Sequence, residues 1–133
     1  MTVLVVDSSV LVAAVTDAGP LGEWAEERLA GAELATPHLA LCEAGNVLRR
    51  LARSGTLAPR EAAAAHRDLL DLDLELFPYA PFAERVWALA AAVTAYDAWY
   101  VALAEALGAP LATLDRRLAR APGPRCRFLT PSQ

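Results

Sequence analysis

The sequence contains no lysine, and all twelve of its basic residues are arginine. P-loop nucleotidases, response-regulator receivers and Schiff-base enzymes each depend on a lysine, so the composition argues against these classes. The glycine patterns that cradle phosphates, G-x-G-x-x-G and the Walker loop, are missing as well. We therefore expect no nucleotide site built on a glycine-rich loop.

Cysteine is also scarce. Cys42 and Cys126 stand far apart and form no C-x-x-C pair, which indicates neither a disulfide framework nor a zinc site. No run approaches the roughly 18 apolar residues of a transmembrane helix, and the N-terminal apolar run lacks the basic flank of a signal peptide. We expect a soluble, cytoplasmic protein with no membrane partner.

At 133 residues the chain has the length of one domain, which we predict to span residues 1–133. Hydrophobic residues make up 56% of it, a high share that indicates a surface partly covered by a partner or a second copy. The net charge of −4 argues against an anionic ligand, but the charge is unevenly distributed. Residues 115–133 carry five arginines and one acid, so the acid excess lies upstream.

Short apolar segments alternate with helical patterns along the chain. The β-branched run at 2–6 is continuously apolar, as in a strand buried on both faces of a parallel sheet. Helices are predicted between consecutive strands, and the further strands are expected at 33–36, 74–77, 110–114 and 126–129. This alternation predicts an α/β domain with a central parallel sheet of about four or five strands flanked by helices.

Local signals give expectations for individual helices. Ser8 or Ser9 is predicted to cap the first helix, and a proline is predicted to begin a long helix at 37–54. The alanine-rich stretch at 81–93 is predicted to form another helix, with Trp87 buried.

Two carboxylates directly follow predicted strands, Asp7 after the first and Asp115 after the fourth. Ligands of α/β sheets bind beyond the carboxyl ends of the strands, so both acids are candidates for a site. Asp97 and Glu43 lie early in predicted helices. They would join the other two if those helices begin at the same edge of the sheet.

Three of these acids have an equally simple structural explanation. Asp97 with Thr94 makes a T-x-x-D capping pattern, Asp115 can cap the helix that follows it, and Glu43 can lie on a solvated face. Asp7 is different, because a carboxylate at the end of an apolar strand is costly to bury unless it is paired or binds a cation.

Four carboxylates in one pocket would repel each other unless a hard divalent cation lay among them. Ligation by oxygen alone favours Mg²⁺ or Mn²⁺ over zinc. Such a site suits phosphodiester hydrolysis, in which the metal activates water and neutralises charge on the phosphate. No covalent nucleophile is needed.

Four segments together resemble a known family: VVDSSVL, TPHLALCEAGNVLRRL, TAYDAWYVALAEALGAPLATLD and the trailing RRL. Their order and spacing are similar to the PIN domain, specifically the VapC-type toxins of bacterial and archaeal toxin–antitoxin modules. The resemblance implies a Mg²⁺-dependent endoribonuclease, with Mn²⁺ as a substitute, whose catalytic and metal-binding residues are Asp7, Glu43, Asp97 and Asp115. It further implies that three neighbours support these acids, namely Ser8, Asn46 and Thr113.

The resemblance also implies partners. These are an RNA substrate, a second copy in a homodimer, and a cognate VapB-type antitoxin that inserts a basic residue among the carboxylates. Candidate RNA contacts lie beside Asp115 at Arg116, Arg117 and Arg120, although solvated arginines or contacts with a partner's acids would look the same in the sequence. Two alternatives stay open: a PIN nuclease that acts in RNA processing without toxicity, and a non-catalytic α/β binding module.

Overall fold

The protein, described by a computed structural model over residues 2–132, is built on a five-stranded sheet in the order β3-β2-β1-β4-β5. All neighbouring strands are parallel. The strands are β1 (Thr2–Val6), β2 (Ala32–Pro37), β3 (Leu74–Phe77), β4 (Leu111–Ala112) and β5 (Phe128–Leu129). The predicted α/β class and parallel sheet are confirmed; positions 1 and 133 lie outside the described residues.

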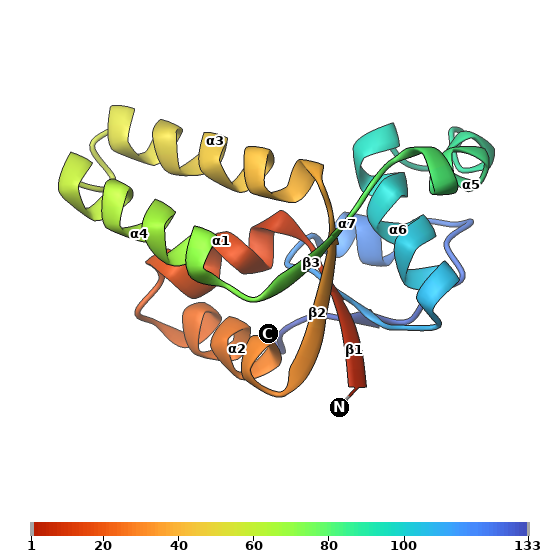
Figure 1. Ribbon diagram of the computed structural model, residues 1–133, viewed down its shortest axis with the longest axis horizontal. Coiled ribbons are helices and arrows are strands. Elements are labelled where there is room, and N and C mark those ends of the chain that lie inside the picture. Colours follow the sequence, from red (N-terminus) through yellow and green to blue (C-terminus); the bar gives the residue numbers. More distant parts are fainter. Residues whose placement is uncertain (1, 133) are drawn as a thin grey trace.

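Helices cover the sheet on both sides. In Figure 1, α1 to α4 lie on one side of the central strands, and α5 and α6 lie on the other. The helices are α1 (Ser8–Thr16), α2 (Pro20–Ala30), α3 (Leu39–Arg53), α4 (Pro59–Asp71), the 3₁₀ turn η1 (Ala80–Phe82), α5 (Ala83–Ala88), α6 (Ala95–Leu107) and α7 (Arg116–Ala119). Among residues 2–132, no helix combines the length and apolarity needed to cross a bilayer.

The direction in which strands are added reverses between β1 and β4. The chain places β2 and then β3 on one side of β1, and β4 and then β5 on the other. The pairing of β1 with β4 continues past the strand end, where the Asp7 N–H donates to the Ala112 carbonyl at 3.0 Å. Such a switch point is where α/β sheets open a crevice for ligands.

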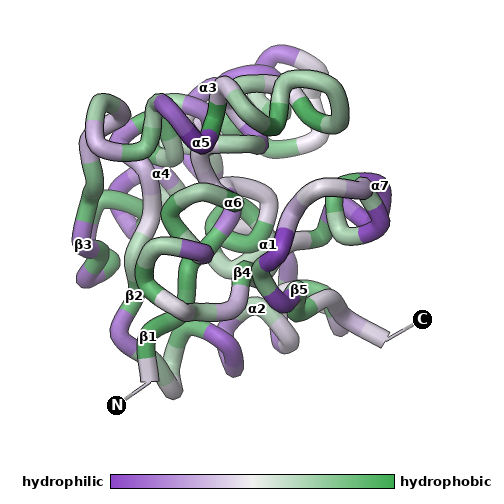
Figure 2. The backbone as a smooth tube through the Cα atoms, turned by 90° about the vertical axis from the view of Figure 1, so that its right-hand side faces the viewer, coloured by the Kyte–Doolittle hydropathy of each residue, from purple (hydrophilic) through white to green (hydrophobic). Residues whose placement is uncertain are grey.

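Helix α6 is the most deeply buried helix of the domain. Its residues 98–104 are all buried, and the helix packs on β1, β2 and β4. Figure 2 shows hydrophobic colour along β1 and α6, in contrast to the hydrophilic α7. Thr94 caps its start by accepting the Asp97 N–H at 3.2 Å, and Gly108 ends it with a φ of 62°. The first turn of α6, which carries Asp97, is therefore held by the core.

Two predicted helix starts are wrong. Helix α1 is preceded by Asp7 as its N-cap, and neither Ser8 nor Ser9 fills that position. Strand β2 runs through Pro37, and α3 begins two residues later at Leu39. The reason is that the His38 N–H donates to the Phe77 carbonyl at 2.9 Å, which extends the pairing of β2 with β3.

The predicted helix at 81–93 is only partly formed, and its predicted extent is wrong. The 3₁₀ turn η1 and the six-residue α5 replace its first half, and turns follow. Trp87 is 81% exposed, because Val86 and Leu89 face the core and successive helical residues point in different directions. The last two strands exist but are shorter than predicted, with two residues each.

Candidate active site

Asp7 is a buried carboxylate surrounded by hydroxyl groups. Only 7% of the residue is exposed, at the carboxyl end of β1. Three hydroxyls donate to it: Thr113 Oγ1 to Oδ2 at 2.6 Å, Ser9 Oγ to Oδ2 at 3.0 Å and Ser8 Oγ to Oδ1 at 3.4 Å. These bonds orient the carboxylate without neutralising its charge.

Two of these hydroxyls are themselves fixed by the backbone after β4. The Leu114 N–H donates to Ser9 Oγ at 3.1 Å, and the Asp115 N–H donates to Thr113 Oγ1 at 3.0 Å. Each hydroxyl accepts one backbone hydrogen bond and donates its own hydrogen bond to Asp7. The segment that carries Asp115 therefore also holds Asp7. Ser9 has this role in addition to the predicted neighbours Ser8 and Thr113.

Asp115 caps α7. Its Oδ1 accepts the N–H groups of Arg117 at 3.0 Å and Leu118 at 3.1 Å. Both bonds use the same oxygen, which leaves Oδ2 for another ligand. The capping explanation and a role in a site are thus compatible.

Asp97 senses the charges of the other three acids. Burial and, next, the negative charges of Asp7, Asp115 and Glu43 together raise its pKa from 3.8 to about 6, against the opposing effect of a hydrogen bond with Thr94. Such effects on a pKa require neighbouring charges. We call Asp7, Glu43, Asp97 and Asp115 the acid cluster.

Glu43 is bound by a tyrosine. The Tyr100 hydroxyl donates to Glu43 Oε1 at 2.6 Å, from α6 to α3. Burial raises the pKa of Glu43, and the Tyr100 bond opposes that effect. Asn46, which we expected to orient Glu43, is exposed, and within residues 2–132 the hydrogen bond to Glu43 Oε1 comes from Tyr100 instead. The sequence did contain a signal for Tyr100: it lies three residues after Asp97, in a D-x-x-Y pattern that places both on one face of a helix.

No basic side chain of the described part of the chain forms an ion pair with the acid cluster. The ion pairs within residues 2–132 are Arg28–Glu27 and Arg85–Glu105. Of the candidate RNA contacts, Arg116 donates to the Pro131 carbonyl at 2.8 Å, while Arg117 and Arg120 are exposed. The negative charge of the cluster is therefore uncompensated by these residues.

The donor set fits a hard divalent cation. No three histidine, cysteine, aspartate or glutamate side chains within residues 2–132 are grouped closely enough to enclose a metal ion by themselves. Mg²⁺ does not need such a cage, because it keeps several waters and binds through one or two carboxylates. The oxygen-only set and its accumulated negative charge match Mg²⁺ or Mn²⁺.

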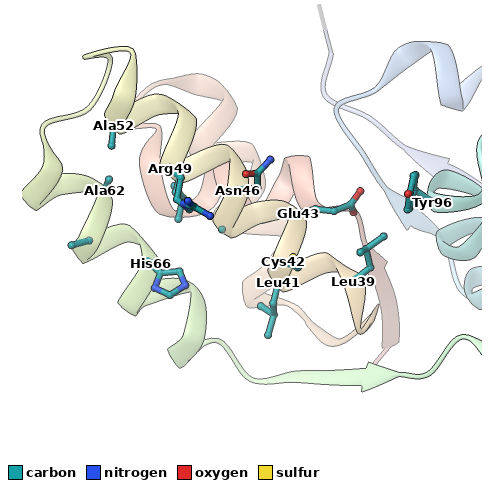
Figure 3. A pocket seen from close by; sticks show the side chains of 13 residues that line it. Leu39, Leu41, Cys42, Glu43, Asn46, Arg49, Ala52, Ala62, His66 and Tyr96 are labelled. Atoms are coloured by element: carbon teal, nitrogen blue, oxygen red, sulfur yellow. The ribbon is translucent and has the colours of Figure 1, made fainter.

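A groove of about 770 Å³ opens beside Glu43, between α3 and α4 (Figure 3). Leu39, Leu41 and Leu48 give it apolar walls, and Tyr96 contributes to its rim from α6. In Figure 3 the Glu43 carboxylate extends from α3 toward the side on which Tyr96 lies. One member of the acid cluster, Glu43, therefore lines the groove.

Comparison with known proteins agrees with this architecture. Residues 4–124 match the family model of the PIN domain. Ribonuclease VapC1 of Mycobacterium tuberculosis is 45% identical over 93 residues, which cover 69% of this chain and 70% of that protein. Ribonuclease VapC3 of Pyrobaculum aerophilum is 42% identical over 121 residues, or 87% and 92% of the two chains. The crystal structure of PAE2754 from the same organism has a TM-score of 0.71 and 28% identity, covering 96% of this chain and 83% of that chain. The chain therefore belongs to the PIN-domain family.

Proposed function

We propose that the protein is a VapC-type toxin, an endoribonuclease that hydrolyses RNA phosphodiester bonds with Mg²⁺ or, in its place, Mn²⁺. The observation that carries the proposal is the acid cluster at the switch point of the sheet, with which no basic side chain of residues 2–132 forms an ion pair. Such a cluster is costly unless a cation completes it. The similarity to ribonucleases named VapC supports RNA as the substrate.

In this proposal Asp7 and Asp115 would hold the metal directly, and Glu43 and Asp97 would complete the site directly or through water. When bound, the metal supplies an activated water and neutralises charge on the phosphate. Ser8, Ser9 and Thr113 fix the Asp7 carboxylate so that it needs no rearrangement during the reaction. Rigid placement of this kind is how a scaffold supports catalysis.

RNA needs positive charge to approach so acidic a site. Arg117 and Arg120 are exposed on the segment that Asp115 opens, and we assign them to phosphate contacts. Arg116 has a different role in part, because its guanidinium donates to the Pro131 carbonyl and holds the C-terminal segment.

The proposed activity is tested by incubating the purified protein with single-stranded and hairpin RNAs in Mg²⁺ or Mn²⁺. Cleavage should require the metal and should stop in EDTA or in the Asp7→Asn variant. Asp68→Asn, an exposed acid on α4, is the matched control and should cleave normally. Cleavage that persists in Asp7→Asn or in EDTA would remove the metal site from the mechanism.

We assign the groove beside Glu43 to the cognate antitoxin. Its leucine-lined walls fit an apolar segment, and the Glu43 carboxylate in its lining fits a basic side chain. Induced expression should arrest bacterial growth, and co-expression of the product of an adjacent antitoxin gene should relieve the arrest. Active nuclease without growth arrest would favour the alternative role in RNA processing.

The proposed homodimer has a candidate surface. Leu76 and Trp87 are large apolar residues that remain exposed on β3 and α5. Exposed apolar groups of this size commonly mark interaction sites in soluble proteins. We assign this surface to contact between two copies of the chain.

A further inference from the structure

Tyr100 places a hydroxyl group inside an apolar core. The residue is 1% exposed and lies on α6 between buried neighbours such as Trp99 and Val101. A buried hydroxyl costs free energy unless it is hydrogen-bonded, and a phenylalanine would fill nearly the same space. The bond to Glu43 Oε1 at 2.6 Å gives this hydroxyl its partner. Packing in the core accounts for an aromatic ring at this position, and the hydrogen bond to Glu43 accounts for the hydroxyl group on that ring.

The same bond joins the two sides of the site. Within residues 2–132 it is the side-chain hydrogen bond between α3 and α6, which lie on opposite sides of the central strands in Figure 1. Asp97 lies three residues before Tyr100, so both lie on one face of α6. Helix α6 therefore supplies one carboxylate of the acid cluster and holds a second that α3 supplies.

Without this hydrogen bond the Glu43 side chain could adopt another rotamer. Its side chain also lines the groove between α3 and α4, so rotation about its flexible bonds can turn the carboxylate away from Asp7 and Asp97. Fixing the carboxylate in advance removes an ordering cost from the assembly of the site. The short distance is typical of a hydrogen bond to an ionised acceptor.

We propose that Tyr100 is a positioning residue of the nuclease site, which holds Glu43 in the acid cluster through its hydroxyl. This inference rests on the proposed function. The test is Tyr100→Phe, which removes one oxygen atom from the protein. Tyr79→Phe is the matched control, because Tyr79, which directly precedes η1, is 40% exposed and packs edge-on against Trp99.

Loss of a hydrogen bond that orients a metal ligand typically costs 10–100-fold in activity or metal affinity. Tyr100→Phe should therefore lower kcat by roughly 10–100-fold and weaken Mn²⁺ binding, measured by calorimetry without RNA, by about 10-fold or more. KM for the RNA should stay within about twofold, and Tyr79→Phe should match the wild type in all three quantities.

A double-mutant cycle with Glu43→Gln distinguishes positioning from general support of the fold. If Tyr100 acts through Glu43, adding Tyr100→Phe to Glu43→Gln should change kcat and Mn²⁺ affinity by less than about twofold. Equal losses in both backgrounds, or a fall in melting temperature that accounts for the lost activity, would overturn the inference. So would wild-type kcat and Mn²⁺ affinity in Tyr100→Phe.

The two proposals fail in different ways. Wild-type protein that cleaves RNA, loses cleavage in Asp7→Asn and is unaffected by Tyr100→Phe would leave the proposed function standing and refute the positioning role. Wild-type protein that cleaves no RNA in either metal would refute the proposed function, whatever the Mn²⁺ affinities.

Discussion

Replacing Asp97 with asparagine should remove a pH-dependent penalty from the metal-free fold. Burial, followed by the charges of Asp7, Asp115 and Glu43, raises the pKa of Asp97 to about 6 in the folded protein, against an ordinary value of 3.8. The ionised form is therefore disfavoured on folding. Above pH 6 the wild type carries this penalty, and the penalty disappears as the pH falls through 6 toward 3.8.

The size of the effect follows from the shift. One pKa unit corresponds to about 1.4 kcal/mol, so the full shift would be worth about 3 kcal/mol. Asp97 is only half-buried, and solvent screening reduces this to about 1 kcal/mol. We expect the free energy of unfolding of the wild type, relative to Asp97→Asn, to rise by about 1 kcal/mol between pH 8 and pH 4.5.

The measurement is urea unfolding of both proteins in EDTA across this pH range. Taking the difference between the two proteins cancels the titration of groups that Asp97 does not influence. Asp68→Asn provides the control for loss of an aspartate outside the acid cluster. A difference that stays flat from pH 8 to pH 4.5, or that changes in the opposite direction, would refute the electrostatic account of the cluster.

Three further predictions concern the supports, the surface and the RNA contacts. Thr113→Val keeps the shape of a buried residue but removes the hydroxyl between Asp7 and the Asp115 N–H, so urea unfolding should show a loss of about 1–3 kcal/mol. Trp87→Ala should convert the proposed dimer to a folded monomer in light scattering, because the Trp87 ring is exposed in the single chain. The double change Arg117→Ala with Arg120→Ala should weaken RNA binding and reduce the salt dependence of log K by about 1–2, whereas an unchanged slope would exclude phosphate contacts.

The strand pattern of the sequence was sufficient for the fold class. Strand 2–6 is apolar from Val3 onward and buried at its last three positions, because both faces of a central parallel strand are covered, and that signal is local. Asp7 and Asp115 became candidates for a related reason, because each follows a predicted strand and parallel strands end at one edge of a sheet. The sheet order, which the sequence did not reveal, places β1 and β4 side by side. Their role as metal ligands stays a prediction.

Local signals failed where tertiary contacts outweighed them. Pro37 is a good first residue of a helix in isolation, but pairing with β3 keeps it in a strand. The alanine-rich stretch at 81–93 has high helix propensity, yet the chain turns after Ala88. Trp87 is exposed because the face of α5 that meets the core is set by packing, and composition does not reveal it.

The sequence by itself determined the fold class, the candidate acids and the position of two of them directly after predicted strands. The tertiary structure decided what joins those acids. Ser9 and Tyr100 contact Asp7 and Glu43 across separations of 2 and 57 residues, and the second of these depends on where α3 and α6 pack. Hydrogen bonds between distant elements follow from packing, so their donors become identifiable only once the elements are placed in space.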